Sequence, residues 1–147
     1  MSQISLSKFI ERLEILCSRQ SAPGLPRKLQ DRQILYKSIT ITLDPGRAYA
    51  EADLNQALEN WLANVGSMLE TDHVTLRRHL VDEGFLLRDP AGQAYAVNTA
   101  EAITALFDSA INALDPASVV EEAKERREKR KRAYLKRYGE MSRGKKR

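Results

Sequence analysis

Nine basic side chains fall within fourteen consecutive residues near the end of the chain, in segment 124–137 with the sequence KERREKRKRAYLKR. Lysine and arginine neutralise phosphate groups, and an aromatic ring stacks on an unpaired base. The segment therefore predicts a nucleic-acid contact in which Tyr134 and Tyr138 supply the rings. Its predicted basic contacts are Arg126, Arg127, Lys129, Arg130, Lys131, Arg132, Lys136 and Arg137.

Two other interpretations of segment 124–137 stay open. A charged run also forms a solvated helix held by its own ion pairs between residues four apart. The pairs with this spacing are Glu122–Arg126, Glu125–Lys129 and Glu128–Arg132. Alternatively, Tyr134, Leu135 and Tyr138 form a stripe that docks on another protein.

A second candidate contact lies on a predicted helix at 73–83. Leu76 and Leu80 are spaced to face the core. The residues nearer solvent are then Thr75, Arg78, His79 and Asp82. Arginine and threonine on such a helix can contact a phosphate or a guanine edge in the major groove. The contacts predicted here and on the following β-ribbon are Thr75, Arg78, His79 and Arg88.

Carboxylates near this helix favour a second interpretation. Asp72, Asp82 and Glu83 flank it, and a neighbouring arginine can pair with a carboxylate instead of a phosphate. We expect that structural role for Arg77. An acidic face of this kind can also bind a protein, so a protein-interaction or RNA- or ribosome-associated adaptor is the alternative to DNA binding.

The charge distribution divides the chain into an acidic body and a basic end. Residues 1–115 carry 11 Lys/Arg against 15 Asp/Glu, a net charge of −4, whereas residues 116–147 carry 13 against 5, a net charge of +8. This asymmetry predicts that the basic end seeks a polyanion. The alternative is that it only solubilises the chain or folds back on the acidic body.

No residue pattern predicts catalysis, a metal site or a cofactor. Outside the carboxylates, the only good zinc ligands are Cys17, His73 and His79, and the two histidines are six residues apart, so they do not share a helix face. The chain has neither a phosphate-binding glycine loop nor a Gly-x-Ser-x-Gly motif. We therefore expect a binding protein rather than an enzyme.

The length of 147 residues and the ordinary composition predict one domain with appendages. A single cysteine, Cys17, allows no internal disulfide, and its place on an apolar stripe predicts a small core residue. No stretch reads as a signal peptide or reaches the roughly 20 apolar residues of a membrane span. A cytoplasmic protein is the expectation.

Hydrophobic spacing and turn signals predict the elements that hold these residues. We expect helices at 4–19, 28–43, 51–63 and 73–83, a linker at 20–26, a loop at 64–70, and short strands at 85–88 and 93–97 around a turn at 89–92. The segment 28–43 also has strand spacing, but no turn interrupts it. Asp72 and Gly84 are the expected N-terminal and C-terminal caps of the fourth helix.

Two further helices are predicted after the ribbon. One covers 99–114, with Asn98 and Glu101 spaced as a capping box. The other begins at Asp115-Pro116 and continues through the basic run, and residues 139–147 are expected to be disordered.

These elements predict a mostly α fold with a small β-ribbon: a winged helix-turn-helix with flanking helices and a C-terminal basic helix. Its parts are an N-terminal helix at 1–20, the winged helix at 27–98, an amphipathic helix at 99–115, and the basic helix and tail at 116–147. The helices at 4–19 and 99–114 either pack against each other and the domain or form a two-fold interface between chains, and of the two we expect the homodimer. Its predicted interface is Leu6, Phe9, Leu13, Ile103, Phe107, Ala110 and Leu114.

Two groups of residues in the middle of the chain carry a family resemblance. They are Pro45, Gly46, Arg47, Tyr49, Glu51, Leu54 and Asn55, then Asp72, Leu76, Arg77, Arg78, Leu80, Val81, Asp82, Gly84, Phe85, Leu86, Arg88, Asp89, Gly92 and Tyr95. Over about residues 28–97 they resemble a bacterial family, the domain of unknown function 2087. Its members stand alone or are joined to helix-turn-helix regulators, so the resemblance implies the fold, and DNA binding and transcription regulation by association.

This chain departs from the family pattern at two places. Ala50 stands where a capping serine or threonine is usual, and segment 64–70 is longer than the usual connection between the two helices. A longer connection can re-aim the helix that follows it.

Overall fold

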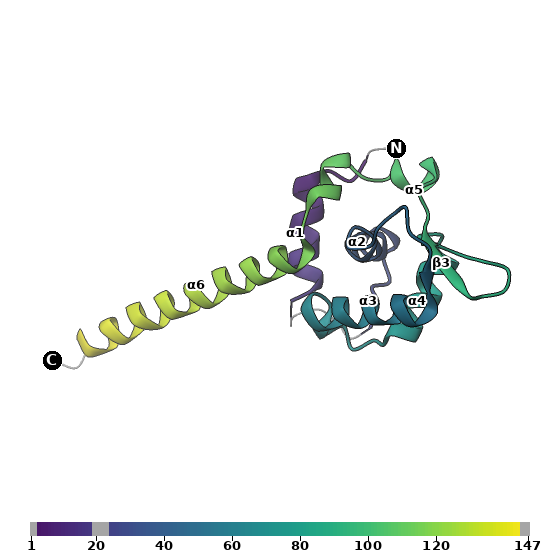
Figure 1. Cartoon of the computed structure of the whole chain (residues 1–147). Helices are drawn as coiled ribbons and strands as arrows, with labels where there is room; N and C mark the ends of the chain where they lie inside the picture. The colour runs from purple at the N-terminus through teal and green to yellow at the C-terminus, as the bar shows by residue number, and fades with distance from the viewer. Residues whose placement is uncertain (1–2, 19–23, 145–147) are drawn as a thin grey trace.

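The structure, a computed structural model, describes residues 3–18 and 24–144 and consists mainly of helices with one small antiparallel sheet (Figure 1). Residues 20–23 of the predicted linker and 145–147 of the predicted tail lie outside the described residues. The elements in chain order are α1 (Leu6–Leu16), α2 (Leu29–Thr40), β1 (Tyr49–Ala50), α3 (Glu51–Asn64), a 3-10 turn η1 (Ser67–Leu69), α4 (His73–Asp82), β2 (Leu86–Arg88), β3 (Ala94–Val97), α5 (Glu101–Thr104), a 3-10 turn η2 (Ser109–Ala113) and α6 (Pro116–Gly144).

Helix α2 lies at the centre of the fold, and Figure 1 looks along its axis with the other elements around it. All of residues 34–40 are buried. A helix covered on every side needs no polar face, which explains why segment 28–43 shows no clear helical periodicity. The predicted helix is confirmed there, and the competing strand is not formed.

Polar side chains of α2 find partners on the surrounding elements. The Trp61 indole Nε1 donates a hydrogen bond of 3.1 Å to the Ser38 hydroxyl. The Tyr36 hydroxyl donates to the Glu83 carboxylate, which also pairs with Arg32 at 3.1 Å. Burial and the neighbouring Glu83 raise the pKa of Tyr36. These bonds join α2 to α3 and to the end of α4.

The connection between α3 and α4 contains η1 and places α4. Gly66 lies so close to Trp61 that a Cβ there would stand 2.3 Å from the indole ring, so the turn fits only glycine. The Asp72 carboxylate accepts a hydrogen bond of 2.7 Å from the backbone N–H of Thr75, and Gly84 ends the helix region at a φ of +84°. Both predicted caps of α4 are confirmed.

The sheet has the strand order β1-β3-β2 with antiparallel pairs. Tyr95 of β3 pairs with Tyr49 of β1 and with Arg88 of β2. Gly92 has a φ of +71° and closes the predicted ribbon turn. The order of helices and strands from α2 to β3 agrees with the predicted winged helix.

The segment 99–114 does not form the single helix predicted. It contains only α5 and η2, because Ile4 lies alongside it: the Ile4 N–H donates to the Leu106 carbonyl, and the Asp108 N–H donates to the Ile4 carbonyl, each at 2.9 Å. The capping box is also wrong. The Asn98 side chain donates a hydrogen bond to the Gly84 carbonyl and accepts one from the Ala100 N–H. The N-cap of α5 is Ala100.

Three residues of the predicted dimer interface belong to the chain's own core. Phe9 and Leu13 are fully buried, and Phe107 is 2% exposed, with ring contacts to Phe9 and Phe85 at centroid distances of 6.4 and 6.2 Å. Their prediction as interface residues is wrong, since α1 and segment 99–114 cover each other. Of the others, Ala110 is exposed, and the half-buried ones are Leu6, Ile103 and Leu114.

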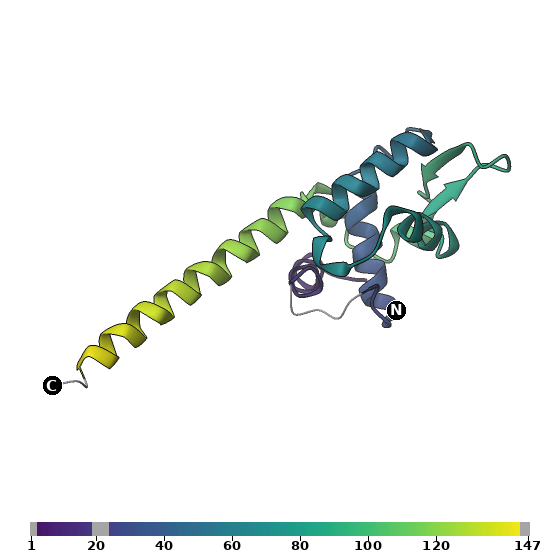
Figure 2. The same cartoon turned by 90° about the horizontal axis from the view of Figure 1, so that it is seen from below.

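Helix α6 begins as predicted and continues further than predicted. The Asp115 carboxylate accepts hydrogen bonds from the Ala117 N–H and the Ser118 hydroxyl. The first turns pack on α1 through Val119 and Ala123, after which the helix leaves the body (Figure 2). Residues 139–144 are helical, so their predicted disorder is wrong. Within residues 3–18 and 24–144, no helix combines the length and the apolar character of a membrane span.

Placing a charge at Phe107 tests the core. Phe107→Asp should abolish the cooperative unfolding transition of the protein, because it removes a buried ring that contacts Phe9 and Phe85 and places a charged group in the core. Circular dichroism during urea unfolding measures this. Ala110→Asp, at an exposed position of the same segment, is the control and should unfold like the wild type. A folded, monomeric Phe107→Asp protein in sedimentation equilibrium would contradict the assignment and restore the predicted interface.

Candidate nucleic-acid interface

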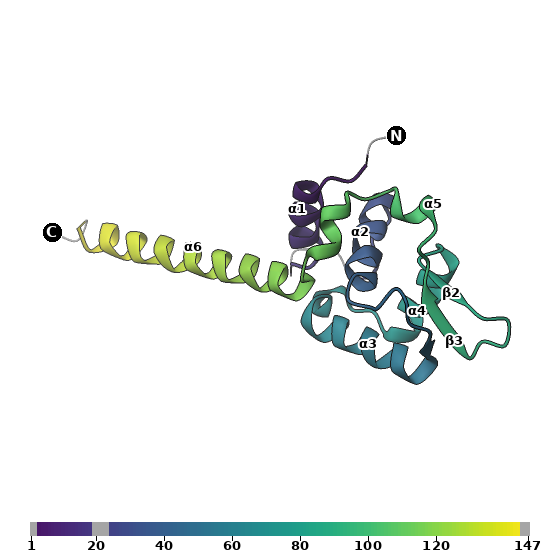
Figure 3. The same cartoon turned by 45° about the horizontal axis from the view of Figure 1, so that its top comes forward.

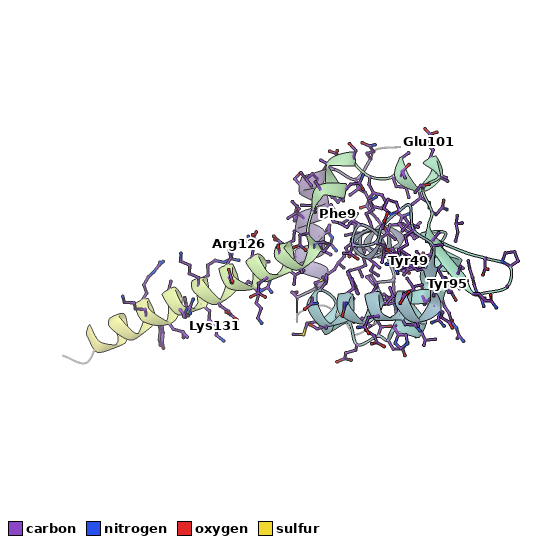
Figure 4. All side chains as sticks on the ribbon, in the orientation of Figure 1. Phe9, Tyr49, Tyr95, Glu101, Arg126 and Lys131 are labelled. Carbon is purple, nitrogen blue, oxygen red and sulfur yellow. The ribbon has the colours of Figure 1, made fainter. Side chains whose placement is uncertain are left out.

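The basic run lies on the part of α6 that no other element covers. Every residue from Lys124 to Tyr138 is exposed, and Figure 4 shows Arg126 near the base of the projecting helix and Lys131 further along it. At about 1.5 Å per residue, segment 124–137 spans roughly 20 Å. The structure thus presents the nine basic side chains of this segment around one straight rod.

The ion pairs predicted within α6 are not formed. Arg126 instead pairs with Glu14 of α1, with 2.6 Å between the guanidinium and the carboxylate. The other basic side chains from Lys124 to Arg137 have no carboxylate within 4.0 Å in the described part of the chain. The prediction of Glu125–Lys129 and Glu128–Arg132 pairs is therefore wrong, and these cations remain available to a ligand.

Two tyrosines extend the exposed surface of α6. Tyr134 and Tyr138 are 66% and 63% exposed, and their rings stack at 6.3 Å with 18° between the planes. Leu135 beside them is 55% exposed. Both a base and an apolar protein surface could pack on such rings.

Of the three contacts predicted on α4, only Arg78 is exposed. Arg78 has no charged or hydrogen-bonding partner among the described residues. Thr75 and His79 are half-buried, and the His79 Nδ1 lies 3.9 Å from the Glu83 carboxylate. The Thr75 backbone N–H lowers the pKa of the exposed Asp72, which keeps a negative charge at the start of the helix.

Arg77 has the structural role expected for it. Its guanidinium donates to the Asn55 side chain at 2.6 Å, lies 3.3 Å from the Glu51 carboxylate, and stands 5.9 Å from the centroid of the Tyr95 ring. The Tyr95 hydroxyl also donates to Glu51. These residues all carry the family resemblance, and together they hold α4 to the start of α3 and to β3.

The Arg88 side chain folds over the backbone of the ribbon turn at Gly92. Arg88 is exposed, and its guanidinium lies over Gly92, where an added Cβ would meet it at 2.3 Å. Asp89 accepts hydrogen bonds from the N–H groups of Gln93 and Ala94, and these bonds lower its pKa. Arg88 therefore shares the tip of the ribbon with a fixed carboxylate.

The two predicted groups of contacts are not brought together. The ribbon of β2 and β3 and the projecting α6 leave the body at opposite ends, as Figures 1 and 3 both show. Arg88 therefore cannot share a compact site with the cations of segment 124–137. The structure offers two surfaces, of which only α6 is strongly basic.

The described residues contain no cluster of three or more His, Cys, Asp or Glu side chains that could hold a metal ion. Cys17 is buried at 5% exposure, and burial raises the pKa of its thiol to about 12. It is a core residue, as predicted.

Lys37 was not among the predicted site residues, yet it is buried in α2 beside an open hollow. The sequence does contain a sign of this burial, because Lys37 is the only charged residue in segment 34–40, ILYKSIT. A lone lysine in such a stretch is easily assigned to the exposed face of an amphipathic helix.

Comparison with known proteins identifies a family. The model of a family described as an uncharacterized protein conserved in bacteria, the domain of unknown function 2087, matches residues 24–97. No curated protein and no solved structure matches the chain.

The two neighbouring arginines of α4 should differ in their effect on stability. Arg77→Ala leaves Asn55 and Glu51 without their partner and should lower the free energy of unfolding by about 1–3 kcal/mol. Arg78→Ala, on the same helix but without a partner, should change it by less than about 0.5 kcal/mol. Urea unfolding compares them. Equal losses would mean that the Arg77 contacts do not hold α4 in place.

Proposed function

This chain belongs to the bacterial family of the domain of unknown function 2087, whose description names no activity, and we propose that it is a nucleic-acid-binding protein. The proposal rests on one observation above all: the basic side chains of segment 124–137 are exposed, and among them only Arg126 is paired with a carboxylate of the described residues. Phosphate groups are the ligands that such a row of free cations suits best.

The charge distribution supports a phosphate contact on α6 rather than on the body. Segment 124–137 carries nine basic and two acidic residues, whereas residues 1–115 have a net charge of −4. A polyanion is attracted to the helix and repelled by most of the body. Helix α6 therefore supplies the sequence-independent part of the affinity.

We further propose that the body is a winged helix whose α4 enters the major groove of duplex DNA, as in transcription regulators. The order of its helices and strands supports this, and so does the exposed, unpaired Arg78 on α4. DNA is favoured over RNA because the deep, narrow major groove of RNA helices does not admit such a helix.

An adaptor that docks on a protein or a ribonucleoprotein is the second candidate. The exposed Tyr134 and Tyr138, with Leu135 between them, favour it, because exposed tyrosine side chains are typical anchors of protein interfaces. In this case α6 would bind its partner through these three side chains, and the neighbouring cations would only assist.

Neutralising part of α6 should reduce both affinity for DNA and its dependence on salt. Replacing Arg127, Lys129, Arg130 and Lys131 with glutamine should flatten the slope of log K against log salt by about 0.9 for each phosphate that the protein no longer neutralises. Gel shifts of the full-length protein with duplex DNA and with structured RNA, each with heparin as competitor, measure this at several salt concentrations. Truncation after Ala123 should have the larger effect.

A control variant with Tyr134→Ala and Tyr138→Ala keeps every charge of α6. If it loses binding while the glutamine variant keeps an unchanged salt slope, the electrostatic contact is wrong and the two rings hold the nucleic acid instead. Absence of binding by the wild type to both nucleic acids would favour the protein-docking candidate.

Sequence preference, where present, should depend on Arg78. Arg78→Ala should reduce discrimination between a preferred duplex and a scrambled one by roughly 1–3 kcal/mol if the guanidinium contacts a base edge. Competition gel shifts with duplexes selected from a random library measure this, with Arg78→Lys as a control that keeps the charge at the same position. A uniform loss across all duplexes would assign Arg78 to a phosphate instead.

A further inference from the structure

Lys37 is a buried cation without an anionic partner. It lies in the central helix α2 and is 9% exposed. Among the described residues, no carboxylate is within 4.0 Å of its ammonium group, and no hydrogen bond is formed by it. Its one close electrostatic contact is the Phe107 ring, whose centroid is 5.2 Å from Nζ. Burying an ammonium in this way is unfavourable unless an anion compensates the charge.

Lys37 borders a hollow of suitable size. A space of about 340 Å³ opens beside Lys37, within the range of small-molecule sites. Its wall is mainly apolar and includes Ile41, Phe85, Val97 and Ile103. No acidic residue lines this hollow, so an anion placed here would meet a cation and an apolar wall.

The rim offers neutral hydrogen-bond donors. Thr104 and Asn112 line this hollow and also a neighbouring one of about 360 Å³ that Lys37 borders as well. Neither side chain forms a hydrogen bond with another described residue. The carboxylates of the neighbouring hollow are Glu101 and Asp108; Glu101 is exposed and points away from the body (Figure 4), and Asp108 accepts from the Ala110 N–H.

We propose that this hollow binds a small organic acid, whose carboxylate pairs with Lys37 and whose apolar body packs between Ile41, Val97 and Ile103. The apolar wall selects against inorganic anions, which would lose their hydration there and have no apolar body to pack against it. The carboxylate supplies the charge that the protein itself lacks at this position. Burial lowers the pKa of Lys37, and a bound carboxylate would shift it back towards its usual value.

The site is independent of the proposed nucleic-acid contacts. Neither Lys37 nor the wall residues belong to α4, the ribbon turn or α6. Failure of the DNA experiments would therefore leave this proposal standing, and the reverse also holds.

A matched pair of probes tests it with the full-length protein. We expect 3-phenylpropanoate to bind in isothermal titration calorimetry and to raise the thermal midpoint with increasing concentration. The neutral 3-phenylpropanamide has the same body and should bind roughly tenfold more weakly or not at all, since a charge-assisted contact is absent.

Variants identify the cation. Lys37→Met keeps the length of the side chain, should fold at least as stably as the wild type, and should lose the preference for the acid over the amide. Lys37→Gln serves if the methionine variant does not fold, and Lys8→Met, at an exposed lysine of α1, should bind like the wild type. Absence of binding by the acid, equal binding of acid and amide by the wild type, or an unchanged preference in the Lys37 variants would overturn the proposal.

Discussion

Complete burial of α2 is the constraint on which the remaining architecture depends. Residues 34–40 face other elements in every direction, so α1, α3, α4 and segment 99–115 must each turn an apolar side inward. The buried hydroxyls of α2 also need hydrogen-bond partners. Ser38 donates to the Leu35 carbonyl within the helix and accepts from Trp61, and Tyr36 donates to Glu83. Two elements far apart in the sequence are thereby fixed to the same helix.

Much of the fold could be predicted because caps and turns act locally. Asp72 and Gly92 each determine a nearby backbone geometry, whatever the distant parts of the chain do. The prediction of a single helix at 99–114 was wrong for the opposite reason. Its apolar spacing suits a helix, but Ile4, about a hundred residues away in sequence, takes the backbone groups of Leu106 and Asp108. No local sequence pattern shows that Ile4 binds there. For the same reason, the sequence did not show that Phe107 lies in the core rather than on the surface.

The candidate site shows the same division between local and distant information. Exposure of the basic run could be predicted from its composition, because charged side chains fill eleven of its fourteen positions. The partner of Arg126 could not be predicted in this way, because Glu14 lies beside it only when α6 packs on α1. Arg77 and Arg78 are neighbours of identical type, yet one is enclosed by α3 and β3 and the other is free. Only the direction in which each side chain leaves α4 separates them.

The uncovered length of α6 makes its own folding depend on what surrounds it. Like charges lie four residues apart at Arg126 and Arg130, and at Arg127 and Lys131, and such pairs destabilise a helix that no tertiary contact supports. Salt that screens this repulsion, or a polyanion that neutralises it, stabilises the helix. Helix content beyond Ala123 is therefore a variable that ionic conditions set, and the reach of the protein from its body changes with it.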